Sequence, residues 1–61
     1  MSFKSRMVYV VMRKREEDII PVAVFYDEET AHGNAEGYNL EFKDRGIEGI
    51  NFYVSVTVSY E

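Results

Sequence analysis

The side chains with the greatest potential for chemistry are one histidine, His32, and the serines Ser2, Ser5, Ser55 and Ser59. A serine nucleophile needs a nearby histidine, an acid that orients it and, in many hydrolases, a sharp strand-to-helix turn. No such turn motif surrounds any of these serines, and cysteine, the other common nucleophile, is absent. No glycine-rich loop opens a helix, as a phosphate-binding loop would. We therefore predict that the chain is not an enzyme.

Three consecutive acids, Asp27, Glu28 and Glu29, are the second chemical feature. They could be a metal cluster, but consecutive carboxylates in the first turn of a helix point in different directions. At a helix start, acids satisfy free backbone N–H groups and complement the helix dipole. We therefore predict that Asp27 is an N-cap that accepts from the backbone of Glu29 or Thr30. Because cysteine is absent and His32 is the only histidine, we expect no zinc and no other cofactor.

The small size of the chain bears on its stability. Its 61 residues, 1–61, form one domain, and a domain of this size buries only about 60% of the surface that its unfolded chain exposes. Natural domains of similar length usually add disulfides, a metal or a partner subunit. Disulfides are excluded because there is no cysteine, and a structural zinc site is nearly excluded. We therefore expect a homo-oligomer, with a marginally stable monomer as the alternative.

The charge balance argues against several partners. Seven basic residues stand against eleven acidic ones, for a net charge of −4. Phosphate backbones are bound by clustered lysine and arginine, so nucleic acid is disfavoured as the main partner. No apolar run of signal-peptide or bilayer length occurs, and the absence of cysteine fits a reducing compartment. We expect a soluble, cytoplasmic protein without membrane contact.

Two apolar runs in the first half of the chain indicate strands. Residues 7–12 are apolar on both faces, which is typical of a central strand. Residues 19–26 form the second run, and Pro21 places it at a sheet edge because proline has no N–H to donate. The intervening residues 13–18 are basic and then acidic, which favours a solvated hairpin loop over a phosphate-binding patch. No Asn-Gly or Asp-Gly pair indicates a two-residue turn.

The apolar period becomes helical from Ala31 and ends near residues 43–46, where Gly46 can form a left-handed cap. One stripe of this helix is apolar and consists of Ala31, Ala35, Tyr38 and Phe42. A second stripe lies on roughly the opposite side and consists of Gly33, Gly37 and Leu40. The second stripe is interpreted either as an exposed, poorly optimised surface or as a place where another backbone comes close.

The last segment, residues 52–60, has the clearest pattern in the sequence. Its apolar residues Phe52, Val54, Val56, Val58 and Tyr60 alternate strictly with Tyr53 and hydroxyl-bearing residues. This alternation predicts a long strand with one buried face. The segment contains neither charge nor proline, the usual devices that protect an exposed edge strand.

Together these elements predict an α+β domain of the ββαβ type. A three-stranded antiparallel sheet in the order 2-1-3 would place the first strand in the centre and Pro21 at an edge, with the helix on one face. The predicted core against the helix consists of Val8, Val10, Met12, Val22, Val24, Phe52, Val54, Val56 and Val58. The predicted opposite face includes Tyr9, Val11, Ala23, Phe25, Tyr53, Ser55 and Thr57.

One helix cannot cover both faces, so the opposite face is predicted to bind a partner. The main interface candidates are Tyr9, Val11, Phe25, Tyr53, Ser55 and Thr57, together with the edge of the last strand. The secondary candidates are Gly33, Gly37 and Leu40. Aromatic side chains supply far more apolar area than glycines do, so we favour the sheet surface over the helix stripe.

The order and composition of these segments also resemble a group of small domains from phage and bacterial genomes. The resemblance is carried by residues 8–11 (Val-Tyr-Val-Val), 21–25 (Pro-Val-Ala-Val-Phe), 27–31 (Asp-Glu-Glu-Thr-Ala) and 52–56 (Phe-x-Val-x-Val). The glycine-bearing helix and the uncharged last strand depart from the pattern of that group. The resemblance implies a ββαβ fold and a phage or accessory-gene context, and it implies no site residues.

The sequence thus favours a homodimeric protein-binding module. The phage context, which is implied by the resemblance, suggests an inhibitor or modulator of a host defence protein. The alternative is a single-stranded nucleic-acid binder that stacks bases on Tyr9, Phe25 and Tyr53.

Overall fold

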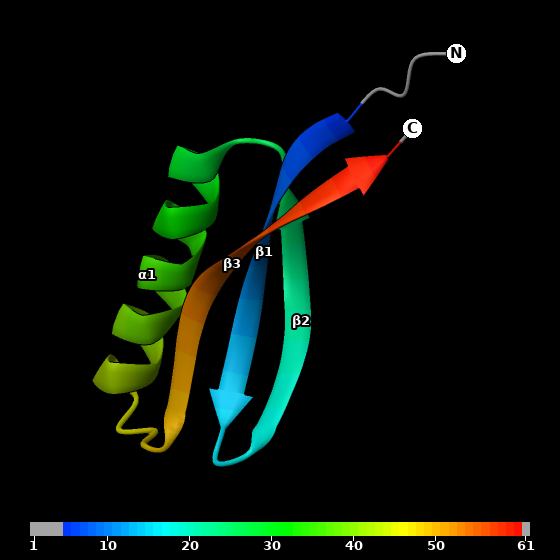
Figure 1. Cartoon of the computed structure of the whole chain (residues 1–61). Coiled ribbons are helices and arrows are strands. Elements are labelled where there is room, and N and C mark those ends of the chain that lie inside the picture. Colours follow the sequence, from blue (N-terminus) through cyan, green and yellow to red (C-terminus); the bar gives the residue numbers. More distant parts are fainter. Residues whose placement is uncertain (1–4, 61) are drawn as a thin grey trace.

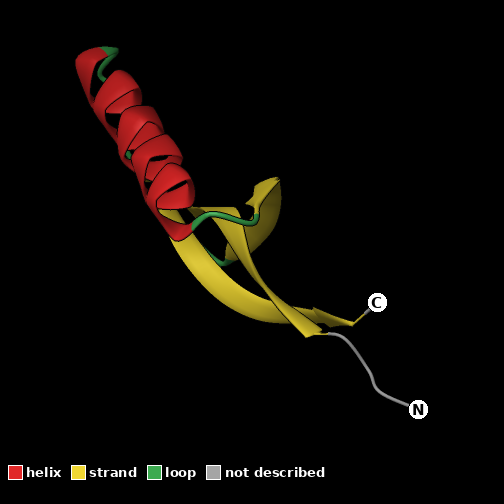
Figure 2. Ribbon diagram, turned by 90° about the horizontal axis from the view of Figure 1, so that it is seen from above, coloured by secondary structure: helices red, strands yellow, loops and turns green. Residues whose placement is uncertain are grey.

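A computed structural model describes residues 5–60. Its elements are β1 (Ser5–Arg15), β2 (Asp18–Phe25), α1 (Glu28–Asp44) and β3 (Ile50–Tyr60), as Figure 1 shows. The sheet has the order β2-β1-β3, with β1 antiparallel to both neighbours, and α1 lies on one side of it (Figure 2). The predicted α+β fold is confirmed. Residues 1–4 and 61 lie outside the described part, so the expected lack of a signal sequence and the full span 1–61 are not described.

The hairpin between β1 and β2 is tighter than predicted. Residues 13–15 and 18 belong to the strands, and Arg15 pairs with Asp18 across the end of the hairpin. The two-residue loop therefore consists of Glu16 and Glu17, and Glu16 has φ = 55°. A positive φ at the first central residue alone matches a type II′ turn, which usually has glycine there. The predicted exposed hairpin is present, with Arg15 opposite Asp18, but its loop is shorter than predicted because the chain makes this turn without the usual glycine.

The ends of α1 confirm the predicted caps. Asp27 is the N-cap, and its carboxylate accepts from the backbone N–H of Thr30 at 2.8 Å. At the other end, Gly46 has φ = 72° and donates to Lys43 O at 3.0 Å, while Ile47 donates to Phe42 O at 2.9 Å. This pair of bonds is a Schellman motif, which satisfies carbonyls that the last helical turn leaves free.

The predicted apolar stripe of α1 does face the sheet, where it surrounds Phe52 of β3. Ala31 and Ala35 are buried with Phe52 in the core cluster. The Tyr38 ring stacks on Phe52 with centroids 4.8 Å apart, and the Phe42 ring meets it edge-on at 5.0 Å. Aromatic contacts of this geometry add stabilisation beyond the burial of area, so Phe52 anchors the helix to the sheet.

The face of β1 that contacts the helix is opposite to the predicted one. Val11 is fully buried in the core cluster, and Tyr9 packs against that cluster. Val11 lies directly opposite Val54 of β3, so the two side chains share the face that α1 covers. The predicted residues Val8, Val10 and Met12 consequently lie on the other face; Val8 is buried there, outside the core cluster.

The prediction for β2 is corrected as well, because β2 follows the reversed face of β1. The pairing of β1 with β2 shifts between Val11, which pairs with Ala23, and Met12, which pairs with Pro21. Val22 is the extra residue, and an extra residue changes which side chains share a face with the partner strand. Ala23 pairs with Val11 and Phe25 pairs with Tyr9, so Ala23 and Phe25, and not the predicted Val22 and Val24, pack against the core cluster. Pro21 lies on an edge strand, as predicted.

Two strand ends extend beyond the rest of the domain. Residues 5–8 of β1 pair only with residues 57–60 of β3, because the pairing with β2 ends at Tyr9 and Phe25. We call this two-stranded ribbon the arm, and Figure 1 shows it running past α1 and β2. The radius of gyration is 13.7 Å, against about 10 Å for a compact domain of this length. The domain is therefore elongated by the arm, on which Met7 and Val58 are largely exposed. The arm is covered in part, because Val8 is buried and Arg6 lies 4.6 Å from the centroid of the Tyr26 ring.

Candidate functional site

The open edge of β3 is the candidate site, and one of its ends is closed by a side chain from α1. The Asn39 amide donates through Nδ2 to Phe52 O at 2.8 Å and accepts through Oδ1 from Phe52 N at 2.9 Å. Both backbone groups of Phe52 therefore point away from β1, toward the helix. The side-chain amide binds them as the peptide group of a neighbouring strand would.

The alternation of strand geometry then places the other free backbone groups of β3. In an antiparallel pair, opposite residues alternate between hydrogen-bonded and non-hydrogen-bonded pairs. Phe52 and its partner Arg13 form a non-hydrogen-bonded pair, so the same holds two, four and six residues further along β3. The N–H and C=O groups of Val54, Val56 and Val58 therefore point to the open edge. In the described chain no strand lies beyond β3 to bind them.

The side chains along this edge are apolar on one face and polar on the other. Val56 is 51% exposed and Val58 is 43% exposed, although both belong to the face that α1 covers further down the strand. Met7, opposite Val58 on β1, is 50% exposed. The predicted buried face of β3 therefore ends near Val54, because the helix reaches no further; the side chain of Tyr60 lies outside the described part.

A groove runs beside the sealed end of the edge, between α1 and β3. Its lining consists of residues 52–54 of β3 and of polar and apolar residues on the side of α1 next to β3. His32, Glu36 and Lys43 bring both signs of charge to the lining, and Leu40 is 56% exposed there. This mixed, open lining lacks the convergent polar groups of an active site.

The main interface candidates from the sequence do not share one surface. Tyr9, Val11 and Phe25 belong to the helix side, where Val11 has no exposed surface and the two aromatic rings pack against the core cluster. Tyr53, Ser55 and Thr57 alternate with Phe52 and Val54, so they lie on the opposite face. Only these last three, which also follow the open edge of β3, remain together as a candidate surface.

The secondary candidates lie on the exposed side of α1. Gly33 and Gly37 line one shallow depression, and Leu40 lines the groove beside β3. A Cβ atom built on either glycine would meet nothing within 4 Å. No close approach of another backbone within the described chain therefore requires these glycines.

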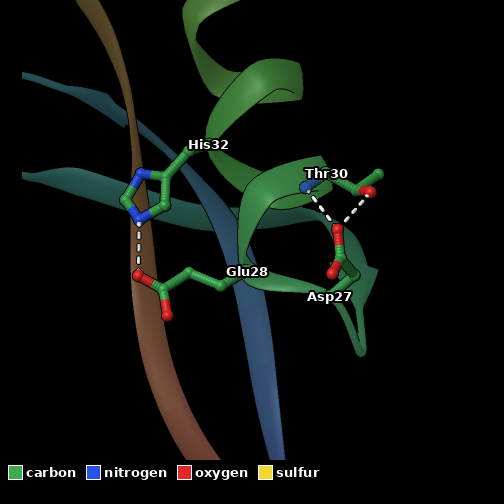
Figure 3. A network of polar contacts seen from close by, with 4 residues as sticks. All are labelled: Asp27, Glu28, Thr30 and His32. Atoms are coloured by element: carbon green, nitrogen blue, oxygen red, sulfur yellow. Dashed lines mark hydrogen bonds and ion pairs between the residues drawn. The ribbon is translucent and has the colours of Figure 1, made fainter.

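The acids at the start of α1 form caps and surface contacts, as Figure 3 shows. The Asp27 carboxylate accepts from the Thr30 hydroxyl at 2.6 Å as well as from its backbone N–H. These two bonds hold the pKa of Asp27 below its usual value, and the bond from the hydroxyl has the larger effect. His32 Nε2 lies 3.8 Å from Glu28 Oε1, with both side chains exposed, so this contact contributes little to stability.

Two further searches concern only the described part of the chain. Within residues 5–60, histidine and acidic side chains form no group of three or more that could hold a metal ion. No helix in the same range is long and apolar enough to cross a membrane.

Sequence reasoning missed Asn39, the residue that determines where the edge begins. Asn39 follows Ala31 and Ala35 at the same helical spacing, so it is a polar residue at the end of a buried row. That position is the one signal that could have indicated a buried polar partner for the sheet. The partner itself could not be predicted, because the contact joins residues from separate elements.

Comparisons with known proteins identify no relative of this chain. No protein-family model matches it, and neither the curated proteins nor the solved structures contain a match. Its function must therefore be argued from its own residues, and the resemblance to small phage and bacterial domains stays a prediction.

Proposed function

We propose that the chain is a protein-binding module that acts as a homodimer and binds through the open edge of β3. The observation that carries the proposal is the row of outward-pointing backbone groups at Val54, Val56 and Val58. Edge strands of this kind recruit another strand unless charge, proline or a covering element protects them. From Phe52 to Tyr60 the strand contains none of the protecting residues.

The small core supports association. Among residues 5–59 only Val8, Val11, Ala31, Ala35 and Phe52 are buried apolar residues. A two-stranded ribbon is marginally stable in water, and the arm is a two-stranded extension of the sheet on which Met7 and Val58 are largely exposed. A second strand along β3 would bind the free backbone groups and cover part of Val56 and Val58. Association therefore offers stabilisation that the single domain lacks.

The narrower proposal is that the module inhibits or modulates a host protein. It is supported by the resemblance to phage and bacterial domains, and by a surface that binds without catalysis. Inhibition by occlusion needs a binding edge and no active site. The open sheet face near Tyr53 and Val24 is a second surface available to such a partner.

The nucleic-acid alternative required Tyr9, Phe25 and Tyr53 on one open face. Tyr9 and Phe25 pack against the core cluster on the helix side, whereas Tyr53 belongs to the other face. The three rings therefore form no common platform on which bases could stack. The net charge of −4 also opposes binding to phosphates, so we favour protein as the partner.

The dimer is tested by size-exclusion chromatography with light scattering, over a hundredfold dilution that begins in the micromolar range. Val56→Pro removes one edge-facing N–H and no bond to β1, so it should shift the mass toward monomer while circular dichroism stays native. Gly37→Glu, on the exposed side of α1, is the control and should leave the dimer intact. A monomer mass for the unmodified chain at every concentration would refute the proposal.

A further inference from the structure

The backbone of β3 restricts how a second strand can pair with it. The free N–H and C=O groups belong to Val54, Val56, Val58 and, by the same alternation, Tyr60, where the strand ends. Phe52 would be next in the row, but Asn39 occupies both of its groups. The stretch that can accept another strand therefore runs from Val54 to Tyr60, and its midpoint is Thr57.

Antiparallel registers differ in how many of these groups they bind. With the two-fold axis at Thr57, Val54 faces the partner's Tyr60 and Val56 faces the partner's Val58, so no free group is left over. With the axis at Val56, Tyr60 would face the partner's Phe52. The N–H and C=O groups of that Phe52 are already bound by the partner's Asn39. With the axis at Ser55, Val58 would face the partner's Phe52, whose groups are already bound, and the pairing would have to extend past that position for Tyr60 to reach the partner's Ile50. Unpaired backbone groups are costly when buried, so the first register is favoured.

We propose that two copies of this chain join through β3 in an antiparallel pair with the two-fold axis at Thr57. The inference rests on the proposed function, because it specifies the partner and register of the same edge. The product is a continuous sheet in which the two arms lie side by side at the centre. Each Asn39 marks the end of the pairing in its own copy.

The side chains of β3 favour a second copy of β3 as the strand that binds to this edge. Pairing Val56 with the partner's Val58 sets apolar side chains against apolar ones on the helix side. On the other face, Thr57 meets the partner's Thr57, and opposite hydroxyl residues are favourable cross-strand pairs. Because residues 52–60 carry no charge, the two-fold axis brings no like charges together within the strand. One contact also covers two unprotected edges, whereas a foreign strand would cover one.

The surroundings of the edge leave room for the partner. The groove between α1 and β3 is open along residues 52–54, next to the place where the partner strand would end. In the arm, residues 57–60 lie beyond the reach of α1, so the helix does not overhang the axis (Figures 1 and 2). The two helices then lie on the same face of the sheet, at opposite ends of the paired strands.

Disulfide cross-linking of single-cysteine variants tests the register of the two β3 strands directly, because the chain has no cysteine of its own. Thr57 would face its own copy in a non-hydrogen-bonded pair, where Cα atoms are about 4.5 Å apart and a disulfide fits. Under mild oxidation, Thr57→Cys should run mostly as a covalent dimer. Ser55→Cys and Ser59→Cys are matched controls: each thiol would face a serine and lie about 13 Å from its equivalent. The double variant Ser55→Cys/Ser59→Cys should cross-link again, and it serves if Thr57→Cys fails to fold.

The outcomes separate this inference from the proposed function. A dimer mass with cross-linking of Thr57→Cys and of the double variant, and with neither control cross-linked, supports the register. A dimer mass with cross-linking of Ser55→Cys alone, of all variants equally, or of none overturns the register and leaves the homodimer standing. A monomer mass before oxidation refutes the homodimer itself, and a strand from a different protein then becomes the occupant to test.

Discussion

The side chain of Asn39 on α1 pairs with the backbone of Phe52 on β3 as a strand would, through two hydrogen bonds of 2.8 and 2.9 Å. A net gain of about 1 kcal/mol for each bond means that Asn39→Ala should lower the free energy of unfolding by about 2 kcal/mol. Denaturant unfolding measures this change. The amide proton of Phe52 should also lose protection from hydrogen exchange.

Asn51→Ala is the matched control for Asn39→Ala, since Asn51 is an exposed asparagine on β3, next to Phe52. Its effect should stay within about 0.5 kcal/mol. Equal effects of the two substitutions would show that the Asn39 contact adds no stability.

The hairpin turn predicts a stabilising substitution at Glu16. A residue with a Cβ atom at φ = 55° costs about 1 kcal/mol relative to glycine, so Glu16→Gly should raise the midpoint of thermal unfolding. Glu17 has no positive φ, so Glu17→Gly should be neutral or destabilising, because glycine adds entropy to the unfolded chain. If both substitutions lower stability, the turn does not have this conformation in solution.

The glycines of α1 predict a second stabilising change. Gly33 and Gly37 have ordinary helical φ angles and open space where a Cβ atom would stand. Each Gly→Ala substitution should raise the free energy of unfolding by about 1 kcal/mol. Gly46→Ala should be destabilising because φ is 72° there. Since Gly33 and Gly37 are the secondary interface candidates, a change in oligomer mass in these variants would point to the helix as an interface.

The Asp27 cap predicts a pH dependence. Its pKa is lowered in the folded chain, mainly by the Thr30 hydroxyl and then by the Thr30 backbone N–H. The folded state therefore binds the Asp27 proton less readily than the unfolded state does. The stabilisation is fully present above the ordinary pKa of 3.8 and is lost as the pH falls through the lower folded value. Asp27→Ala should be less stable than the parent at neutral pH, and the difference should shrink in acid.

A carboxyl-carbon NMR titration measures the Asp27 pKa itself. Thr30→Ala removes the hydroxyl donor and keeps the backbone N–H, so the pKa should rise partway toward its usual value. An unchanged pKa in Thr30→Ala would mean that the hydroxyl bond is not formed in solution.

The sequence was sufficient to predict the elements, their order and the position of each strand in the sheet. Asp27 and Gly46 showed where the helix begins and ends, and Pro21 placed β2 at an edge. The phase of β3 near Phe52 was also correct, because apolar and polar residues alternate there with strong contrast. These features depend on local backbone chemistry, so neighbouring residues contain the information.

The tertiary structure alone decided which face of β1 the helix covers. Residues 7–12 are apolar on both faces, so their alternation has no contrast, and the choice depends on the register that sets Val11 opposite Val54. The bulge at Val22, the limit of helix coverage near Val54 and the contact of Asn39 with Phe52 likewise depend on residues from separate elements. Register and packing depend on which side chains from distant parts of the chain contact one another. The local pattern of a single sequence does not specify those contacts.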